Sequence, residues 1–294
     1  MILYRLFLLF DAIFMILPVS FRRGFFQFLG RIAHKFAGKR NKIIQKNLEY
    51  AFGDSLTPEI RIKSEIGCYK NLVSNVLQVM ENRRLPKEEV VSSVQFENLE
   101  HITPYLERKQ PIIFVSGHFG NWEVGGVAMA SRLTPISTIY KGFENARFDP
   151  YLKIARSRFG LDPFEKNGAL KHMAKTLKNG KSLMILIDQA SNKKNGILVD
   201  FFNHPTYHTT GPASLAAKFG APIVGVYAFP NESGQTTLKF LPPVELSDSS
   251  EDSLKDGTQK IVDDLEKMIR LRPDLWFWCH KRWKGENPSL YENL

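Results

Sequence analysis

Cysteine is scarce in this sequence, with only Cys68 and Cys279 among 294 residues. Two cysteines this far apart match neither the ligand spacing of a zinc site nor a disulfide framework. We therefore expect both to be free thiols in a reducing compartment.

Linkers, internal repeats and low-complexity tracts are also missing. Without a spacer, a chain of this length is expected to form one large domain or two closely packed ones. The sequence has no Gly-x-Ser-x-Gly motif either, so nothing indicates a serine nucleophile.

Acidic residues are fewer than basic ones, 30 against 40, which gives a net charge of +10. Such a field favours anionic partners: phospholipid headgroups, phosphorylated glycolipids or an acidic carrier protein. We expect no nucleic-acid partner, because the basic residues are dispersed and no binding motif is present.

The N-terminus carries the longest apolar run, residues 6–21, which Asp11 and Pro18 interrupt. A bilayer span needs about 20 apolar residues, and no small-residue cleavage site indicates a signal peptide. Basic residues follow from Arg22 onward, which predicts that this side of the segment lies at the cytoplasmic face of the membrane, against anionic lipid. We expect a hydrophobic membrane-anchor helix over 1–24, before a domain over 25–294. Whether it spans the bilayer or lies in the interface stays open, since Asp11 is costly in mid-bilayer; a buried core helix is the alternative.

The stretch 111–123 organises the rest of the chain. Residues 111–116 are apolar and β-branched and predict a buried strand; 117–121 form the turn that leaves it, and a packed helix begins near Glu123. Ligands of open α/β sheets bind at this edge. There His118 can act as a general base, and a carboxylate can fix its tautomer.

His118 and Glu123 are five residues apart, so in one continuous helix they would point about 140° apart. They can meet only if the histidine lies in the turn and the glutamate at the helix start, a bend that Gly120 makes easy. The alternative is a core histidine beside a glutamate that complements the helix dipole.

Strands and helices alternate along the remaining chain. Helical periodicity covers 25–50, 58–82, 97–107, 149–159, 168–177, 212–219 and 253–271, and strand patterns cover 135–140, 182–187, 221–228 and 236–241. Thr57 and Pro58 mark the start of the second helix. The alternation predicts an α/β fold with a mainly parallel sheet sandwiched by helices.

Residues 117–123, Gly-His-Phe-Gly-Asn-Trp-Glu, resemble the His-x4-Asp/Glu signature of the glycerolipid acyltransferase superfamily. The residues after the histidine, Phe-Gly-Asn-Trp-Glu, are similar to those of the late acyltransferases of lipid A biosynthesis. The mycobacterial phosphatidylinositol mannoside acyltransferases are related to that family. Residues 40–52, 201–227 and 276–284 resemble further blocks of the family, so the resemblance covers most of the chain. It implies an O-acyltransferase without a cofactor at the cytoplasmic face of the bacterial inner membrane.

The resemblance also implies roles for the acidic residues. His118 would take the proton of an acceptor hydroxyl, which attacks the thioester of an acyl carrier protein, so no acyl-enzyme is needed. We expect Glu123 to orient His118. Asp188, after the strand at 182–187, is a competing orienter, because an acid at a similar place in the mannoside branch is thought to pair with the histidine. Its alternative is a helix cap or a solvated loop acid.

Substrate contacts are expected at the same edge. Asn121 lies within the signature, and backbone N–H groups near Gly211, at a helix N-terminus, are candidate oxyanion donors. Where family members show Tyr-Arg, this chain has Lys141, which lacks the planar fork of arginine. Arg156 and Arg158 would supply the missing guanidinium, with a solvated basic face as the alternative.

Two further groups of residues invite a functional reading. His204 and His208 lack a third ligand nearby, so we expect loop residues and no metal. The aromatic and basic segment 276–284 suits a membrane-interface edge or a sugar-phosphate rim, and equally a packed C-terminal strand.

Three functions remain open from the sequence. They are acyl transfer to a lipid A precursor, acylation of another glycolipid or a lysophospholipid, and a non-catalytic basic membrane-surface protein. For the first two, the acyl chain is expected in a groove lined by Phe114, Phe119 or Phe143.

Overall fold

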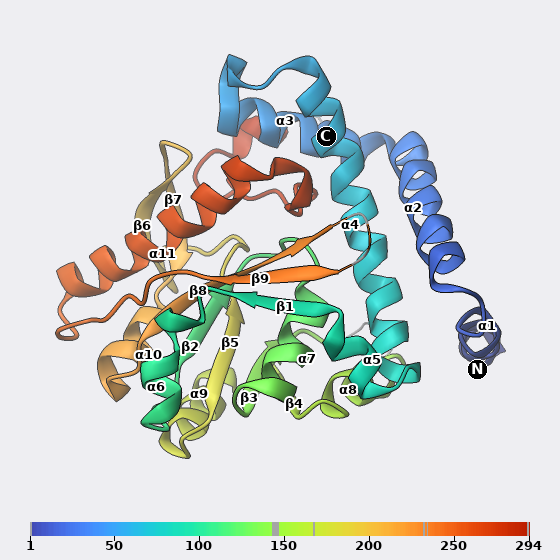
Figure 1. The fold of residues 1–294 in the computed structure, drawn as a ribbon. Helices are drawn as coiled ribbons and strands as arrows, with labels where there is room; N and C mark the ends of the chain where they lie inside the picture. The colour runs from blue at the N-terminus through green and yellow to red at the C-terminus, as the bar shows by residue number, and fades with distance from the viewer. Residues whose placement is uncertain (1, 143–146, 167, 232, 234, 293) are drawn as a thin grey trace.

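The computed structural model describes residues 2–142, 147–166, 168–231, 233, 235–292 and 294. Its central layer is a seven-stranded sheet in the order β1-β9-β8-β2-β5-β3-β4 (Figure 1). The strands are β1 (Val94–Glu97), β2 (Ile113–Ser116), β3 (Ile136–Tyr140), β4 (Leu161–Glu165), β5 (Ser182–Leu186), β8 (Ile223–Pro230) and β9 (Thr236–Phe240). All neighbours run parallel except β8 and β9, so the predicted mainly parallel sheet is confirmed.

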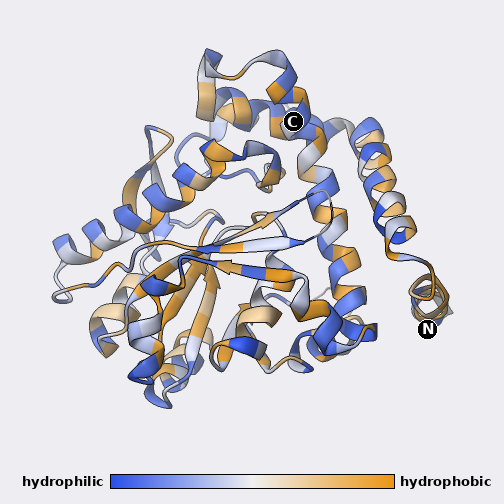
Figure 2. Ribbon diagram, viewed as in Figure 1, coloured by the Kyte–Doolittle hydropathy of each residue, from blue (hydrophilic) through white to orange (hydrophobic). Residues whose placement is uncertain are grey.

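Helices cover both faces of the sheet. Alternate side chains of β2 point to opposite faces: Phe114 packs in a core with α5 (Lys87–Ser92), α6 (Thr103–Glu107) and α7 (Trp122–Arg132). Ile113 and Val115 pack in a second core with helices of the other face, α9 (Ala169–Lys178), α10 (Gly211–Phe219) and α11 (Glu251–Leu271). The central strands are among the most hydrophobic segments (Figure 2), as a strand buried on both sides requires.

A long helix, α4 (Pro58–Arg84), packs beside the sheet against α2 (Val19–Phe36), α7 and α8 (Asp149–Ser157). The hydroxyl of Thr57 accepts a hydrogen bond from the Ile60 N–H at 3.4 Å, so the predicted start of this helix is confirmed. The helix predicted over 25–50 is two helices, because α2 (Val19–Phe36) ends before Ala37 and α3 (Gly38–Phe52) begins after it.

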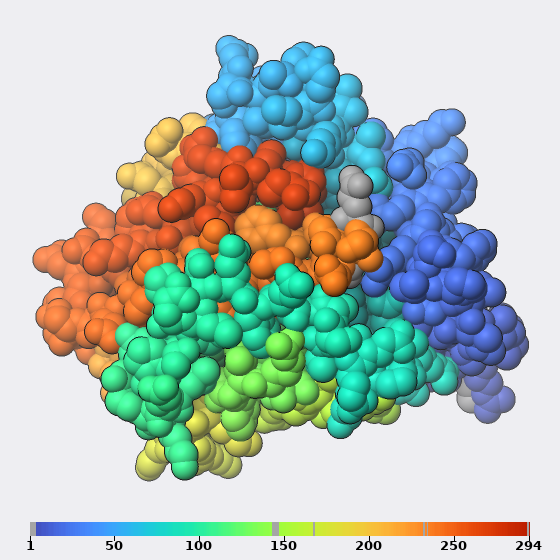
Figure 3. All heavy atoms as spheres, in the orientation of Figure 1, coloured from blue at the N-terminus to red at the C-terminus, as the bar shows by residue number. Residues whose placement is uncertain are grey.

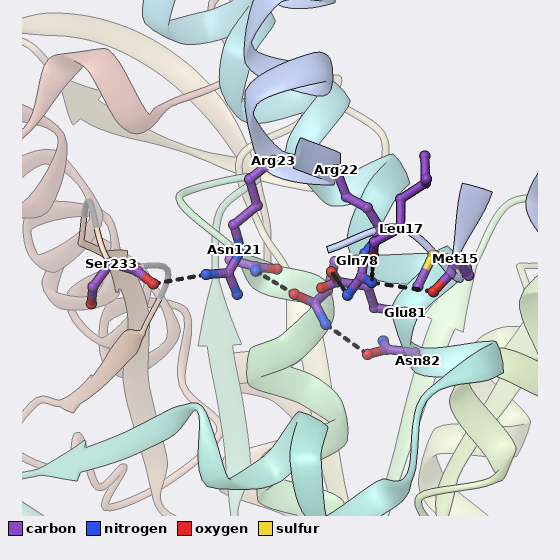
Figure 4. A network of polar contacts seen from close by, with 9 residues as sticks. All are labelled: Met15, Leu17, Arg22, Arg23, Gln78, Glu81, Asn82, Asn121 and Ser233. Carbon is purple, nitrogen blue, oxygen red and sulfur yellow. Dashed lines mark hydrogen bonds and ion pairs between the residues drawn. The ribbon is translucent and has the colours of Figure 1, made fainter. Parts of the chain in front are cut away.

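The N-terminal apolar segment also forms two elements, α1 (Ile2–Phe14) and α2, which meet at a turn before Pro18. Arg22 closes this turn by donating to the carbonyl oxygens of Met15 at 3.2 Å and Leu17 at 2.6 Å, and it pairs with Glu81 on α4 at 3.2 Å (Figure 4). In the described part of the chain, no helix is both long and apolar enough to cross a membrane.

Asp11, the residue that makes a membrane span costly, faces the protein. Its side chain is fully buried, and one oxygen lies 2.7 Å from Nε of Arg84 on α4. The inner face of α1 therefore docks on α4, while its other face carries exposed apolar side chains.

The segment 196–209 folds as an antiparallel hairpin, β6 (Gly196–Phe201) and β7 (His204–Thr209). The prediction that His204 and His208 are loop residues was wrong, since both lie on β7. Phe202 and Asn203 form the two-residue turn with positive φ angles of 56° and 61°, and a type I′ hairpin turn requires positive φ at both positions.

The segment after α11 wraps back under the carboxyl edge of β2. Trp276, Trp278, Trp283 and Arg282 are buried. The membrane-interface alternative is therefore wrong for these tryptophans. The segment packs into the core as irregular chain, with one bridge between Phe119 and Trp276.

Candidate active site

The pairing of β2 with β5 brings two sequence-distant side chains together. Ser116 is the register partner of Leu186, and the ladder continues with the Ile187 N–H donating to the Ser116 carbonyl at 2.8 Å. Each strand then runs two residues further, to His118 and to Asp188. The histidine and the aspartate therefore stand side by side at the carboxyl edge of the sheet.

Asp188 holds His118 through both carboxylate oxygens. Oδ1 lies 2.9 Å from the His118 Nδ1, and Oδ2 accepts the His118 backbone N–H at 2.8 Å and the Trp276 indole N–H at 2.9 Å. An ionised carboxylate only accepts, so in the neutral imidazole Nδ1 carries the proton and Nε2 presents its lone pair. The His118 side chain is 23% exposed and that of Asp188 4% exposed.

The electrostatics of the pair favour its ionised form. Burial acts to lower the pKa of His118, but the charge of Asp188 and the hydrogen bond to it outweigh burial and raise that pKa above 6.5. Burial acts to raise the pKa of Asp188, but the charge of His118 and the bonds from His118 and Trp276 hold it below 3.8. The carboxylate therefore stays charged wherever the histidine titrates.

The loop that carries His118 is fixed by its backbone. Gly120 has a φ of +57°, and a Cβ there would lie 1.6 Å from the Ala228 carbonyl oxygen. The Gly120 carbonyl accepts from the Asn75 side chain on α4 at 2.8 Å, and its N–H donates to the Leu275 carbonyl at 2.9 Å. The glycine is required here, and three distant segments set the position of the histidine.

The two acids take the reverse of the order predicted from the sequence. Glu123, expected to orient His118, instead pairs with Arg156 at 2.6 and 3.1 Å, in the bidentate geometry of a strong charge-assisted contact. Both side chains are nearly buried, at 8% and 13% exposure. Glu123 lies in the first turn of α7, and its pairing with Arg156 on α8 leaves the histidine to Asp188.

Arg158 and Asn121 are both used inside the protein. The Arg158 guanidinium donates to the carbonyl oxygens of Asn82 and Leu85 at 2.7 and 3.0 Å, where α4 ends. The Asn121 amide oxygen caps α7 by accepting the Val124 N–H at 3.1 Å. These contacts place the two residues in the scaffold around the site.

The Asn121 amide nitrogen donates to the Gln78 side-chain oxygen at 2.8 Å, and the Gln78 amide nitrogen donates to the Asn82 side-chain oxygen at 2.9 Å (Figure 4). In the same view, Arg23 on α2 reaches the Ser233 carbonyl at 2.7 Å. The loop after His118 is thus tied through α4 to the N-terminal helices.

Lys141 and Gly211 lie at the same edge but apart from the pair. Lys141 follows β3 directly and is exposed. Gly211 begins α10, and its N–H donates to the Thr209 hydroxyl at 3.2 Å. Among the described residues, neither forms a hydrogen bond or ion pair with His118 or Asp188.

Three contributors to the site escaped prediction: Trp276, Phe277 and Asn75. Trp276 bonds to Asp188, Asn75 holds the loop, and the Phe277 ring lies 6.1 Å from the His118 ring, centroid to centroid. The aromatic block was visible in the sequence, but its position beside Asp188 depends on the return of the chain after α11.

No metal-binding arrangement accompanies the pair in the described ranges, which hold no cluster of three or more His, Cys, Asp or Glu. The thiols of Cys68 and Cys279 are unbridged, with their sulfur atoms 3.5 Å apart in the core.

His118 is held by a buried carboxylate, and no described residue forms a hydrogen bond with its Nε2. A histidine in this arrangement can accept the proton of a hydroxyl group. The chain belongs to the bacterial lipid A biosynthesis acyltransferase family, whose model matches residues 2–285.

Curated relatives align along nearly the whole chain. A lipid A biosynthesis lauroyltransferase of Escherichia coli is 25% identical over 280 residues, which cover 93% of this chain and 89% of that one. A lipid A biosynthesis acyltransferase of Haemophilus influenzae is 24% identical, covering 89% and 81%. A phosphatidylinositol mannoside acyltransferase of Mycolicibacterium smegmatis is 20% identical, covering 91% and 86%.

Proposed function

We propose that this protein moves a fatty acyl chain from acyl carrier protein to a hydroxyl group of a lipid A precursor. The observation that carries the proposal is the bond from His118 Nδ1 to Asp188, which leaves Nε2 as a base. Nε2 takes the hydroxyl proton while the oxygen attacks the thioester carbonyl carbon. When the tetrahedral intermediate collapses, the thiol leaves with the proton from His118, and the ester remains on the lipid.

Arg156 is our candidate for stabilising the oxyanion of that intermediate. Its Nε and Nη2 donate to Glu123, and no described residue accepts a hydrogen bond from its Nη1. A guanidinium held in place by a buried carboxylate needs little reorganisation when charge develops. Glu123 then acts by positioning Arg156.

A different glycolipid remains the second candidate for the acceptor, because a phosphatidylinositol mannoside acyltransferase aligns over 91% of the chain.

The groove expected for the acyl chain needs correction, because Phe114 and Phe119 are fully buried in the core and cannot line it. Phe143 lies outside the described residues.

The donor assignment predicts a preference between two carriers of the same acyl group. An acidic carrier protein should be steered electrostatically to a chain of net charge +10. The kcat/KM for the acyl carrier protein donor should therefore fall as the salt concentration rises. Acyl-coenzyme A lacks that protein surface and should be the poorer donor. Initial rates with a fixed lipid acceptor at low and high salt test this, and equal efficiency without salt dependence would refute it.

We also place the protein at the cytoplasmic face of the bacterial inner membrane, held by α1 and α2. These helices form one edge of the molecule (Figure 3). The exposed apolar side chains of these helices and of the turn between them are Leu6, Leu9, Phe10, Ile13, Ile16, Val19, Phe21, Phe28, Ile32 and Phe36. Apolar surface of this extent, next to basic residues, suits a helix pair lying in the lipid interface.

Replacing Ile16, Phe28 and Phe36 together by glutamine should lower partitioning into anionic vesicles by at least about tenfold. The matched control replaces three exposed leucines elsewhere, Leu170, Leu198 and Leu271, and should bind as wild type. High salt should not release the unaltered chain, because apolar contacts are not screened. Complete release by salt in a flotation assay would show that attachment is only electrostatic.

A further inference from the structure

A cavity of about 420 Å³ lies between the start of α3 and the C-terminal segment. It is lined in part by Lys39, Arg40, Phe277, His280, Lys281 and Leu294. Lys39 and Arg40 belong to the first turn of α3, where the helix dipole adds a partial positive charge.

The charged side chains that line this cavity are all basic. Lys39, Arg40 and Lys281 form no ion pair with any described residue, and none of the described side chains that line the cavity is acidic. Arg40 makes one weak contact, 3.4 Å from Nη1 to the Cys279 carbonyl, which leaves most of its guanidinium free. Three cations around one cavity suit a phosphate group, which accepts several charge-assisted bonds.

The cavity shares its wall with the active site. The Phe277 N–H donates to the His118 carbonyl at 3.1 Å. The Nε2 of His280 accepts the Ala190 N–H at 3.1 Å, two residues after Asp188. A group held in the cavity is therefore one layer of side chains away from the catalytic base.

The cavity also lies at the end of an apolar stripe. Phe21, Phe28, Ile32 and Phe36 are exposed on α2 and follow one another at helical spacing on one face. The stripe ends three residues before Lys39. With this face in the acyl region of a membrane, the cations are at the level of lipid headgroups.

We propose that this cavity binds the phosphate group of the acceptor lipid and so holds its hydroxyl towards His118. The inference rests on the proposed acyl transfer and adds what selects the acceptor. Lys39, Arg40 and Lys281 bind the phosphate, and the acyl chains of the acceptor lie along the α2 stripe.

Steady-state kinetics test this with Arg40→Gln and Lys281→Gln. Each should raise the acceptor KM on the order of tenfold, with the donor KM and kcat nearly unchanged. With a dephosphorylated acceptor the variants and wild type should have the same KM. Lys63→Gln removes an equal charge from exposed α4 surface outside the cavity and should change neither KM. An equal loss with both acceptors, or a rise in the donor KM alone, would overturn the assignment.

A binding measurement separates this proposal from the chemistry. His118→Ala protein should bind phosphatidylcholine vesicles that carry the phosphorylated glycolipid about tenfold more tightly than vesicles carrying its dephosphorylated form. Adding Arg40→Gln should abolish that preference. If the preference is absent while wild type transfers acyl groups, the cavity proposal fails and the proposed function stands. If His118→Ala retains activity, the proposed function fails. The vesicle-binding preference then still tests whether the cavity binds phosphate.

Discussion

Replacing His118 by alanine should lower kcat for acyl transfer by roughly 10²–10⁴-fold, because the hydroxyl then loses its general base. The ring is partly exposed and held mainly by Asp188, so the fold should survive its removal. His172→Ala, at an exposed position on α9, provides the matched control. Thermal unfolding confirms that both variants are folded, and near wild-type turnover in folded His118→Ala would contradict the assignment.

Asp188→Asn should have the second-largest effect, again roughly 10²–10⁴-fold in kcat. An asparagine offers Nδ1 either a donor or a neutral acceptor, so it neither fixes the tautomer reliably nor stabilises the imidazolium that forms. This loss of kcat should exceed the loss in Glu123→Gln, because the Glu123 carboxylate pairs with Arg156 and not with His118.

Glu123→Gln should act on stability as well as on rate. It leaves the Arg156 guanidinium, 13% exposed, without its ionised partner, and loss of one member of a buried pair costs up to about 3–5 kcal/mol. Denaturant unfolding should therefore separate the two acids. If Glu123→Gln is the more damaging change to kcat while its stability is unaltered, the order of the two acids reverts to the one predicted from the sequence.

Most of the fold can be predicted from local patterns in the sequence. The run 111–116, the cap at Thr57 and most of the helical periodicities are set by neighbouring residues, and the structure has those elements. The prediction of one helix over 97–107 was wrong, because Glu97 ends β1 and only Thr103–Glu107 is α-helical. β4 was missed because it is a five-residue edge strand with Pro163 in its middle, where a strand tolerates proline. The β6–β7 hairpin was missed because its turn has no glycine, although Asn203 adopts positive φ readily.

The geometry of the His118–Asp188 pair could not be predicted from one sequence, because it depends on strand order. Glu123 is near His118 along the chain, whereas Asp188 reaches it only because β5 lies next to β2 in a register offset by 70 residues. Strand order follows from the packing of the whole sheet. The docking of Asp11 on Arg84 has the same origin, since it depends on the place of α4 beside the sheet.

The most direct test of the His118–Asp188 pair is the pH dependence of kcat/KM in wild type, Asp188→Asn and Glu123→Gln. A general base works only when neutral, so the wild-type rate should fall as pH drops through a His118 pKa above 6.5. Without the Asp188 charge, burial is left to lower that pKa, and the acid limb should move to lower pH. Glu123→Gln should move it less, because the charge of Glu123 contributes less to raising the pKa of His118. An acid limb that stays in place in Asp188→Asn, or moves further in Glu123→Gln, would contradict the pairing.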